Sequence, residues 1–182
     1  MNKGLISGLV LLVIGLVCGV LLAFVNSFTA PIIKENADKV VLESLGEVYE
    51  GASNYTLDEV EGSNNVDKLF FLKDKTSGDT VAIIYSVQAE GYQSTISMLI
   101  AIEVNDSDEF VVAGYKVVSQ AETSGIGDKI VGYDFEMDGE IITDLTAFDG
   151  VAGPSAIFSK NAVRACFVTV GARVAADFGG AN

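Results

Sequence analysis

The chain contains no histidine and no tryptophan, and it has only two cysteines among its 182 residues. Without histidine, the Ser-His-Asp and Cys-His nucleophilic arrangements and the imidazole metal ligands are excluded. Cys18 lies in an apolar N-terminal run and Cys166 lies far along the chain, so we expect no disulfide between them. The spacing of the acidic residues also predicts no metal site. A redox function would therefore require a bound cofactor.

Basic residues are scarce as well. Lys and Arg number 11 against 25 Asp and Glu, which gives a formal net charge of −14. Nucleic-acid binding requires clustered positive charge, so we expect no nucleic-acid partner. The same charge argues against a domain that binds anionic lipid, and we interpret the acidity as a solvated surface. The hydrophobic content of 49 % indicates a folded protein, and the length of 182 residues suits one domain and one membrane segment.

The N-terminal part of the chain has a long uncharged run, because residues 4–33 contain no charged side chain. This run exceeds the ~20 apolar residues that cross a bilayer core. A cleaved signal peptide would have a shorter apolar region of about 7–15 residues and a small-residue cleavage site. We therefore predict an uncleaved transmembrane anchor over residues 1–30, with the helix ending or bending at Pro31. Lysines on both sides leave the orientation open.

The remainder, residues 31–182, reads as one domain. Periodicity predicts an amphipathic helix over 32–49, a polar loop over 51–65, strands over 68–73, 80–89, 95–104 and 110–118, a turn over 105–109, and a helix over 159–177. In the last helix we expect the apolar side chains to pack on the sheet and the alanines to allow close approach, namely Val163, Phe167, Val170, Val174, Ala162, Ala165, Ala172 and Ala175. This order predicts an α+β fold with a mixed or antiparallel sheet and flanking helices.

A glycine-rich segment, residues 120–130, follows the last predicted strand. Its glycines free the backbone to turn and to approach a planar ligand, while its other side chains offer an acceptor, a hydroxyl, an apolar face and a cation. The candidate binding residues here are Glu122, Thr123, Gly125, Ile126, Gly127 and Lys129. An ordinary turn after a strand would produce the same pattern.

A second segment, residues 149–159, leads into the last predicted helix. Ser155 or Ser159 could cap the helix N-terminus. The first turn of a helix also accommodates phosphate, so a serine hydroxyl placed there could carry a phosphoester. The candidate binding residues here are Gly153, Pro154, Ser155 and Ala156.

At these residues the chain resembles the FMN-binding-domain family, which includes the G component of the Rnf ferredoxin:NAD oxidoreductase complex and the C component of the sodium-pumping NADH:quinone oxidoreductase. Residues 122–127, Glu-Thr-Ser-Gly-Ile-Gly, are similar to the family's Glu-Thr-Pro-Gly-Leu-Gly loop. Gly91-Tyr92 resembles its glycine-tyrosine strand entry, and residues 22–33 resemble its opening helix. The short chain favours the Rnf component.

The resemblance implies FMN as cofactor, joined through its phosphate to the threonine of a Ser/Thr-Gly-Ala-Thr motif by a flavin transferase. Counting forward from Asp149 places residues 152–155 on this motif, with Ser155 as the acceptor. Ala152, Pro154 and Ser155 then depart from the motif. Counting back from Ser159 places Ala156 at the acceptor position, where no ester can form.

The leading hypothesis is an electron-transfer subunit of a membrane respiratory complex. The resemblance implies FMN, other membrane subunits of a Rnf-type complex, ion-coupled electron flow from ferredoxin to NAD, and a domain on the extracytoplasmic side of the cell membrane. A second hypothesis is a structural or assembly subunit that has lost its covalent flavin. A third is an anchored binding module for a free small ligand, which leaves the 122–127 resemblance unexplained.

Overall fold

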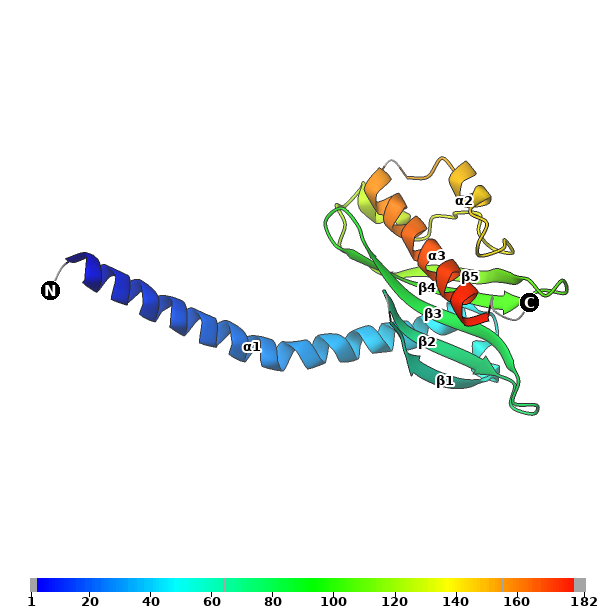
Figure 1. Cartoon of the computed structure of the whole chain (residues 1–182), viewed down its shortest axis with the longest axis horizontal. Coiled ribbons are helices and arrows are strands. Elements are labelled where there is room, and N and C mark those ends of the chain that lie inside the picture. Colours follow the sequence, from blue (N-terminus) through cyan, green and yellow to red (C-terminus); the bar gives the residue numbers. More distant parts are fainter. Residues whose placement is uncertain (1–2, 64, 155, 179–182) are drawn as a thin grey trace. The chain divides into compact units, whose positions relative to one another are not determined.

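The structure is a computed structural model that describes residues 3–63, 65–154 and 156–178. By the density of contacts, the chain divides into two compact units, Met1–Val40 and Val41–Asn182. The first unit is helical, and the second contains the sheet and the remaining helices (Figure 1).

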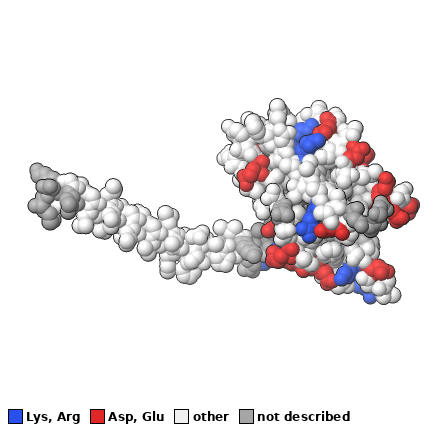
Figure 2. All heavy atoms as spheres, in the orientation of Figure 1, with Lys and Arg blue, Asp and Glu red and all other residues white. Residues whose placement is uncertain are grey.

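Helix α1 runs from Lys3 to Val48 without interruption. Its stretch Ile6–Ile33 is long and apolar enough to cross a membrane, and none of it is buried inside the protein. Figure 2 shows this stretch without charged groups, whereas acidic groups are spread over the visible face of the domain. These properties favour the transmembrane anchor by length and composition.

We predicted that the helix ends or bends at Pro31. It does not end there, because α1 continues through this residue. Proline removes one helical hydrogen bond, and an apolar helix in lipid tolerates this loss where hydroxyl side chains bind nearby carbonyls. Two such bonds lie just before Pro31: the Ser27 hydroxyl donates to the Phe24 carbonyl at 2.7 Å, and the Thr29 hydroxyl donates to the Val25 carbonyl at 3.0 Å.

The second unit is built on one antiparallel sheet with the strand order β1-β2-β3-β4-β5. Its strands are β1 (Thr56–Glu61), β2 (Val66–Lys73), β3 (Thr80–Glu90), β4 (Thr95–Val104) and β5 (Phe110–Ser119). A 3-10 turn η1 (Ala52–Asn54) precedes the sheet, and η2 (Gly127–Ile130), α2 (Thr146–Gly150) and α3 (Ile157–Phe178) follow it. Neighbours in sequence are neighbours in the sheet, and each of the four neighbouring pairs is antiparallel. With the helices before and after it, the sheet confirms an α+β fold.

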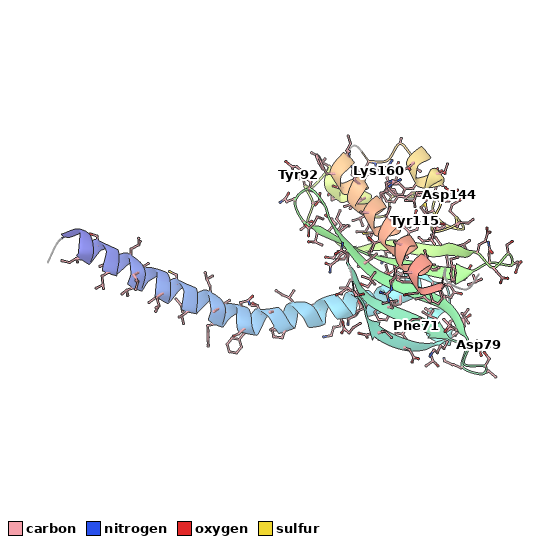
Figure 3. The ribbon with its side chains drawn as sticks, viewed as in Figure 1. Phe71, Asp79, Tyr92, Tyr115, Asp144 and Lys160 are labelled. Carbon is pink, nitrogen blue, oxygen red and sulfur yellow. The ribbon has the colours of Figure 1, made fainter. Side chains whose placement is uncertain are left out.

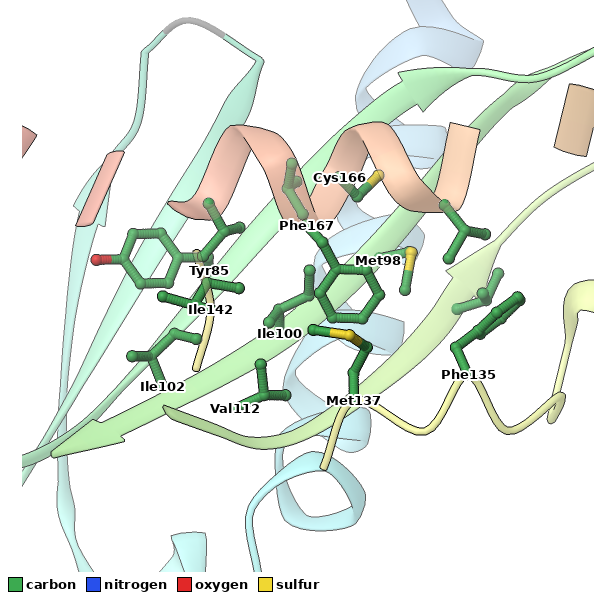
Figure 4. Packing of buried hydrophobic residues seen from close by; sticks show 14 of the residues in the cluster. Tyr85, Met98, Ile100, Ile102, Val112, Phe135, Met137, Ile142, Cys166 and Phe167 are labelled. Atoms are coloured by element: carbon green, nitrogen blue, oxygen red, sulfur yellow. The ribbon is translucent and has the colours of Figure 1, made fainter. Parts of the chain in front are cut away.

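Helix α3 covers one face of the sheet and contacts β3 and β4 (Figure 1). Alternate residues of β4, Ile96, Met98, Ile100 and Ile102, are fully buried beneath it together with Phe167 (Figure 4). This alternation follows from the period of two in a strand. The segment between β5 and α3 extends the same core, where the rings of Phe135 and Phe148 stack with centroids 5.0 Å apart.

The last turns of α1 cover the opposite face. Leu45 and Val48 are buried against Leu72, Ile84 and Leu99. Gly114 of β5 permits this packing, because a Cβ there would lie 2.2 Å from the Val48 carbonyl oxygen. The central strands are therefore buried on both faces, which explains the nearly continuous apolar runs of β3 and β4.

Two sequence predictions about the domain need correction. Residues 56–61 form strand β1 and not a loop. All its residues are exposed, so it lacks the apolar alternation by which a strand is recognised. In α3, Ala162 is buried as predicted, but Ala165, Ala172 and Ala175 face solvent. The close approach is made instead by Gly171, where a Cβ would lie 3.1 Å from the Ile142 carbonyl oxygen.

Candidate binding site

The turn between β3 and β4 forms the first wall of the site. Residues 91–94 are closed by a hydrogen bond from the Gly91 amide to the Ser94 carbonyl, 2.8 Å long. The tight turn directs Tyr92 outward, and this side chain is 71 % exposed beside the first turn of α3 (Figure 3). Its ring lies 5.6 Å from that of Phe158, measured between centroids. Two aromatic rings thus stand side by side at the surface.

The glycine-rich loop after β5 forms the second wall. The Thr123 carbonyl accepts hydrogen bonds from the amides of Ile126, at 3.1 Å, and Gly127, at 2.8 Å. Gly125 lies inside this turn with φ +76°, a conformation that side-chain-bearing residues rarely adopt. The turn leaves Ile126 with about half of its surface exposed. Lys129 lies further on in η2 and is exposed.

Glu122 lies at the base of this loop and is only 8 % exposed. One carboxylate oxygen accepts hydrogen bonds from the amides of Gln93, at 3.0 Å, and Ser94, at 2.9 Å, and from the Ser94 hydroxyl at 3.1 Å. The other accepts from the Tyr92 amide at 3.2 Å and from the Ser159 hydroxyl at 2.7 Å. Burial raises the pKa of Glu122, but the Ser159 hydroxyl and the three amides outweigh it and lower that pKa to about 2.

The first turn of α3 and the segment before it form the third wall. Arg164 binds both carboxylate oxygens of Asp149, at 2.7 and 2.8 Å, and so fastens the end of α2 to α3. Lys160 donates to the Val151 carbonyl at 2.5 Å and lies over the Phe148 ring. Gly153 has φ +70°. Ser155, the predicted acceptor, lies outside the described residues.

These three walls enclose an open cavity of about 300 Å³. We call it the binding cavity, and it is lined by Tyr92, Glu122, Thr123, Ile126, Gly127, Ala156, Ile157, Phe158 and Ser159. Of the predicted binding residues, the structure brings together Glu122, Thr123, Ile126, Gly127 and Ala156. Gly125, Lys129, Gly153 and Pro154 are not among the lining residues.

Sequence reasoning missed Ile157 and Phe158 as site residues and gave Tyr92 no role at the site. Both residues lie just before the predicted helix 159–177, whereas α3 begins at Ile157, and in the structure Ile157 is 69 % and Phe158 is 65 % exposed. Exposed apolar side chains gathered at one place indicate a binding surface. The available signal was the Ile-Phe pair placed directly before the predicted helix.

The binding cavity suits a flavin nucleotide. Its lining is mostly apolar, and Tyr92, Ile126 and Phe158 present flat or branched apolar surfaces to which the faces of a tricyclic ring could pack. The first helical hydrogen bond of α3 runs from the Lys160 amide to the Ala156 carbonyl, so the preceding amides of this helix have no partner within it. Such amides bind phosphate. No lysine or arginine is among the described residues that line the cavity.

Comparison with known proteins agrees with this fit. The RnfG N-terminal region matches residues 1–48, and the FMN-binding domain matches residues 91–165, which include all the lining residues of the cavity. Over 78 residues, the chain is 36 % identical to the G component of the ion-translocating oxidoreductase complex of Buchnera aphidicola subsp. Schizaphis graminum. That alignment covers 35 % of this chain and 37 % of the relative. The chain is therefore an RnfG-like FMN-binding protein, and FMN is its cofactor.

Proposed function

We propose that this protein is the FMN-carrying electron-transfer subunit of a Rnf-type membrane complex and relays electrons in ion-coupled ferredoxin:NAD oxidoreduction. The observation that carries the proposal is the binding cavity, which is built from the segments that match the FMN-binding domain. Bound FMN would supply the electron chemistry by accepting and passing electrons, while the protein would supply its position and surroundings.

Different walls of the cavity would bind different parts of FMN. Tyr92, Ile126 and Phe158 would contact the ring system, and Thr123, which also lines the cavity, would bind its polar edge. The amides at the start of α3 would bind the phosphate. No described cationic side chain lines the cavity, so a freely bound phosphate dianion would have few charge partners there. A covalent phosphate link would overcome this weakness.

For that link we favour Ser155. It directly precedes Ala156, which lines the cavity, and it lies two residues before the start of α3. Ser159 is a poor alternative, because its hydroxyl is buried and donates to Glu122. The Ser155 hydroxyl would attack the phosphorus of FMN in an activated phosphoanhydride donor held by a flavin transferase. The P–O bond of the anhydride would break, and the displaced phosphate would take the serine proton.

The wider setting also belongs to this proposal. Residues 1–30, which include most of the apolar stretch Ile6–Ile33, would anchor the chain in the cell membrane as a single span. Residues 31–182 would form the FMN-binding-type domain on the extracytoplasmic side. The RnfG-type N-terminal region supports assembly with other subunits of the complex. Electron donor and acceptor would then be redox centres of those neighbouring subunits.

The experiment is the intact mass of the full-length protein, expressed with a flavin transferase, beside a Ser155→Ala control. We expect one esterified FMN per chain, absent in the control. An adduct that survives in Ser155→Ala would contradict the choice of Ser155. FMN that copurifies but is released on denaturation would overturn the covalent link and leave the carrier function intact.

A chain that binds no flavin in either form would overturn the electron-transfer function. The alternative, a structural or assembly subunit, is favoured by one feature of the sequence: Ala152 and Pro154 depart from the family motif. Titration of the unmodified protein with FMN, followed by flavin fluorescence, separates this alternative from a carrier that holds FMN without a covalent bond.

A further inference from the structure

Glu122 lines the binding cavity, but its hydrogen bonds are made to the walls of the cavity. We propose that its carboxylate is the positioning group that joins the three walls of the cavity and holds them in place before FMN binds. This inference rests on the proposed function only in taking FMN as the occupant of the cavity.

The hydrogen bonds of Glu122 connect segments far apart in sequence. Four of its five donors belong to the β3–β4 turn, namely the amides of Tyr92, Gln93 and Ser94 and the Ser94 hydroxyl. The fifth is the Ser159 hydroxyl in the first turn of α3. Glu122 itself belongs to the glycine-rich loop. One side chain therefore binds each of the three segments that line the cavity.

Both carboxylate oxygens are fully used by these contacts. An ionised carboxylate has about four lone-pair positions, and five donors already occupy them. Glu122 thus has no remaining capacity to accept a hydrogen bond from a ligand. Three successive amides around one anion form a concave arrangement that binds negative charge well, so the group filling it is the protein's own carboxylate.

Neighbouring side chains reinforce this arrangement. The Ser94 hydroxyl donates to Glu122 and also accepts from the Ala121 amide at 2.8 Å. The Thr123 hydroxyl donates to the Gln93 side-chain oxygen at 3.1 Å. The turn and the loop are therefore connected on both sides of Glu122, and their relative position is fixed by the protein alone.

Two glycines make room for the carboxylate. A Cβ at Gly91 would lie 2.5 Å from the nearer Glu122 oxygen, and a Cβ at Gly127 would lie 2.7 Å from Glu122 Cβ and 2.9 Å from the Ser159 hydroxyl oxygen. Neither glycine has a positive φ, so space and not backbone conformation requires them. Both glycines are explained by Glu122, without any contact to FMN.

The test is amide hydrogen exchange of the full-length protein without flavin, in detergent, comparing wild type with Glu122→Gln. In Gln, an NH₂ group replaces one of the two carboxylate oxygens. The donors that bound this oxygen would then face another donor and lose their hydrogen bonds. We expect exchange at residues 92–94 to accelerate at least tenfold, with the paired amides at the centre of β3 and β4 unchanged. Glu90→Gln is the matched control, because Glu90 is an exposed acid at the end of β3, and it should leave exchange at 92–94 as in wild type.

Ser159→Ala removes one of the five donors and is the second test variant, to be used if Glu122→Gln does not fold. It should accelerate exchange at 92–94 by a smaller factor. Unchanged exchange at these amides in a folded Glu122→Gln protein, or in Ser159→Ala should that protein alone fold, would overturn the proposal.

FMN binding gives a second, separate readout. In Glu122→Gln we expect FMN affinity to fall about tenfold and the visible circular dichroism of bound FMN to weaken, because its surroundings are no longer fixed. A loss of affinity without any change in exchange would indicate that Glu122 contacts FMN directly and would overturn the positioning role. A wild-type protein that binds no FMN would overturn the proposed function, while the exchange result would still decide the role of Glu122.

Discussion

Glu122 combines burial with full ionisation. A buried carboxylate without partners is strongly disfavoured, but five donors compensate for the lost water and lower its pKa to about 2. Because this pKa lies below its ordinary value of 4.5, the ionised group stabilises the fold above pH 4.5, and this contribution is lost as the pH falls towards 2.

The lowered pKa of Glu122 predicts how the stability of the protein depends on pH. We expect Glu122→Gln to unfold at a lower temperature than wild type at pH 7, and we expect the difference to shrink steadily between pH 4.5 and pH 2, because Gln has no proton to gain. Thermal unfolding of both proteins across this pH range measures the difference in unfolding temperature. A difference that stays constant down to pH 2 would contradict the depressed pKa.

Gly91 provides a steric prediction at the same place. In Gly91→Ala the new methyl group would overlap a Glu122 oxygen and the Ser94 carbonyl oxygen, at 2.5 and 2.8 Å. We expect a loss of about 1–3 kcal/mol in the free energy of unfolding. Gly46→Ala is the control, because nothing lies within 4 Å of its Cβ position in α1, and alanine there should be neutral or slightly stabilising. Equal effects of the two substitutions would contradict the steric account.

Cys166 is fully buried in the main core, and this burial raises the pKa of its thiol to about 12. The reactive thiolate is then a very small fraction at neutral pH. In a Cys18→Ala background, we expect the native protein to resist a thiol reagent at pH 8 and to react rapidly once it is unfolded in denaturant. Rapid labelling of the native protein would show that α3 opens readily.

Sequence reasoning at the residue scale selected several of the residues that line the binding cavity. It selected Glu122, Thr123, Ile126 and Gly127 from a resemblance and from local chemistry, and the structure places all four at the cavity. It assigned Glu122 as a contact of the cofactor, because its hydrogen-bond donors lie about thirty residues away and no local pattern connects them. It missed Phe158 because exposure at a helix start depends on what the rest of the fold leaves uncovered.

At the scale of elements, α3 illustrates how one helix faces two environments. Val170 is fully buried against the sheet, whereas Val168, two residues earlier, is 46 % exposed. We expect Val170→Ala to lower the free energy of unfolding by about 2 kcal/mol, because it removes buried carbon and leaves a cavity. Val168→Ala, the same chemical change on the outer face, should change it by less than about 0.5 kcal/mol. Denaturant unfolding of the two variants measures the two changes in free energy of unfolding. Similar losses would contradict the assignment of Val170 to the buried face of α3 and of Val168 to its exposed face.

Most elements could be predicted because their patterns are strong. The apolar runs of β3 and β4 and the spacing of Val163, Phe167, Val170 and Val174 in α3 are confirmed. Strand β1 was missed, since it is held by pairing with β2 and by exposed ion pairs such as Lys73 with Asp58, and not by an apolar face. The continuity of α1 through Pro31 was missed because a rule drawn from helices in water was applied to an apolar helix.

At the scale of the whole molecule, the charge is distributed unevenly along the chain. The stretch Ile6–Ile33 has no charged side chain, while the acidic groups lie in the rest of the chain. We expect the full-length protein to remain in membranes after alkaline carbonate extraction. Lysine at both Val13 and Val17 should cost about 3 kcal/mol for each residue near the middle of a span and release most of the protein. Lysine at both Thr76 and Ser77, in an exposed turn of the domain, should release none.

The three walls of the binding cavity come from residues 91–94, 122–127 and 156–159, and the last of them belongs to the C-terminal helix. During synthesis, the first two segments emerge well before α3 can supply Ser159. A growing or truncated chain therefore has no completed pocket, however well its sheet has formed. Acquisition of the cofactor would accordingly report that the chain has been made and folded through α3. Under the proposed function, chains that end before α3 would lack the cofactor and could not carry electrons.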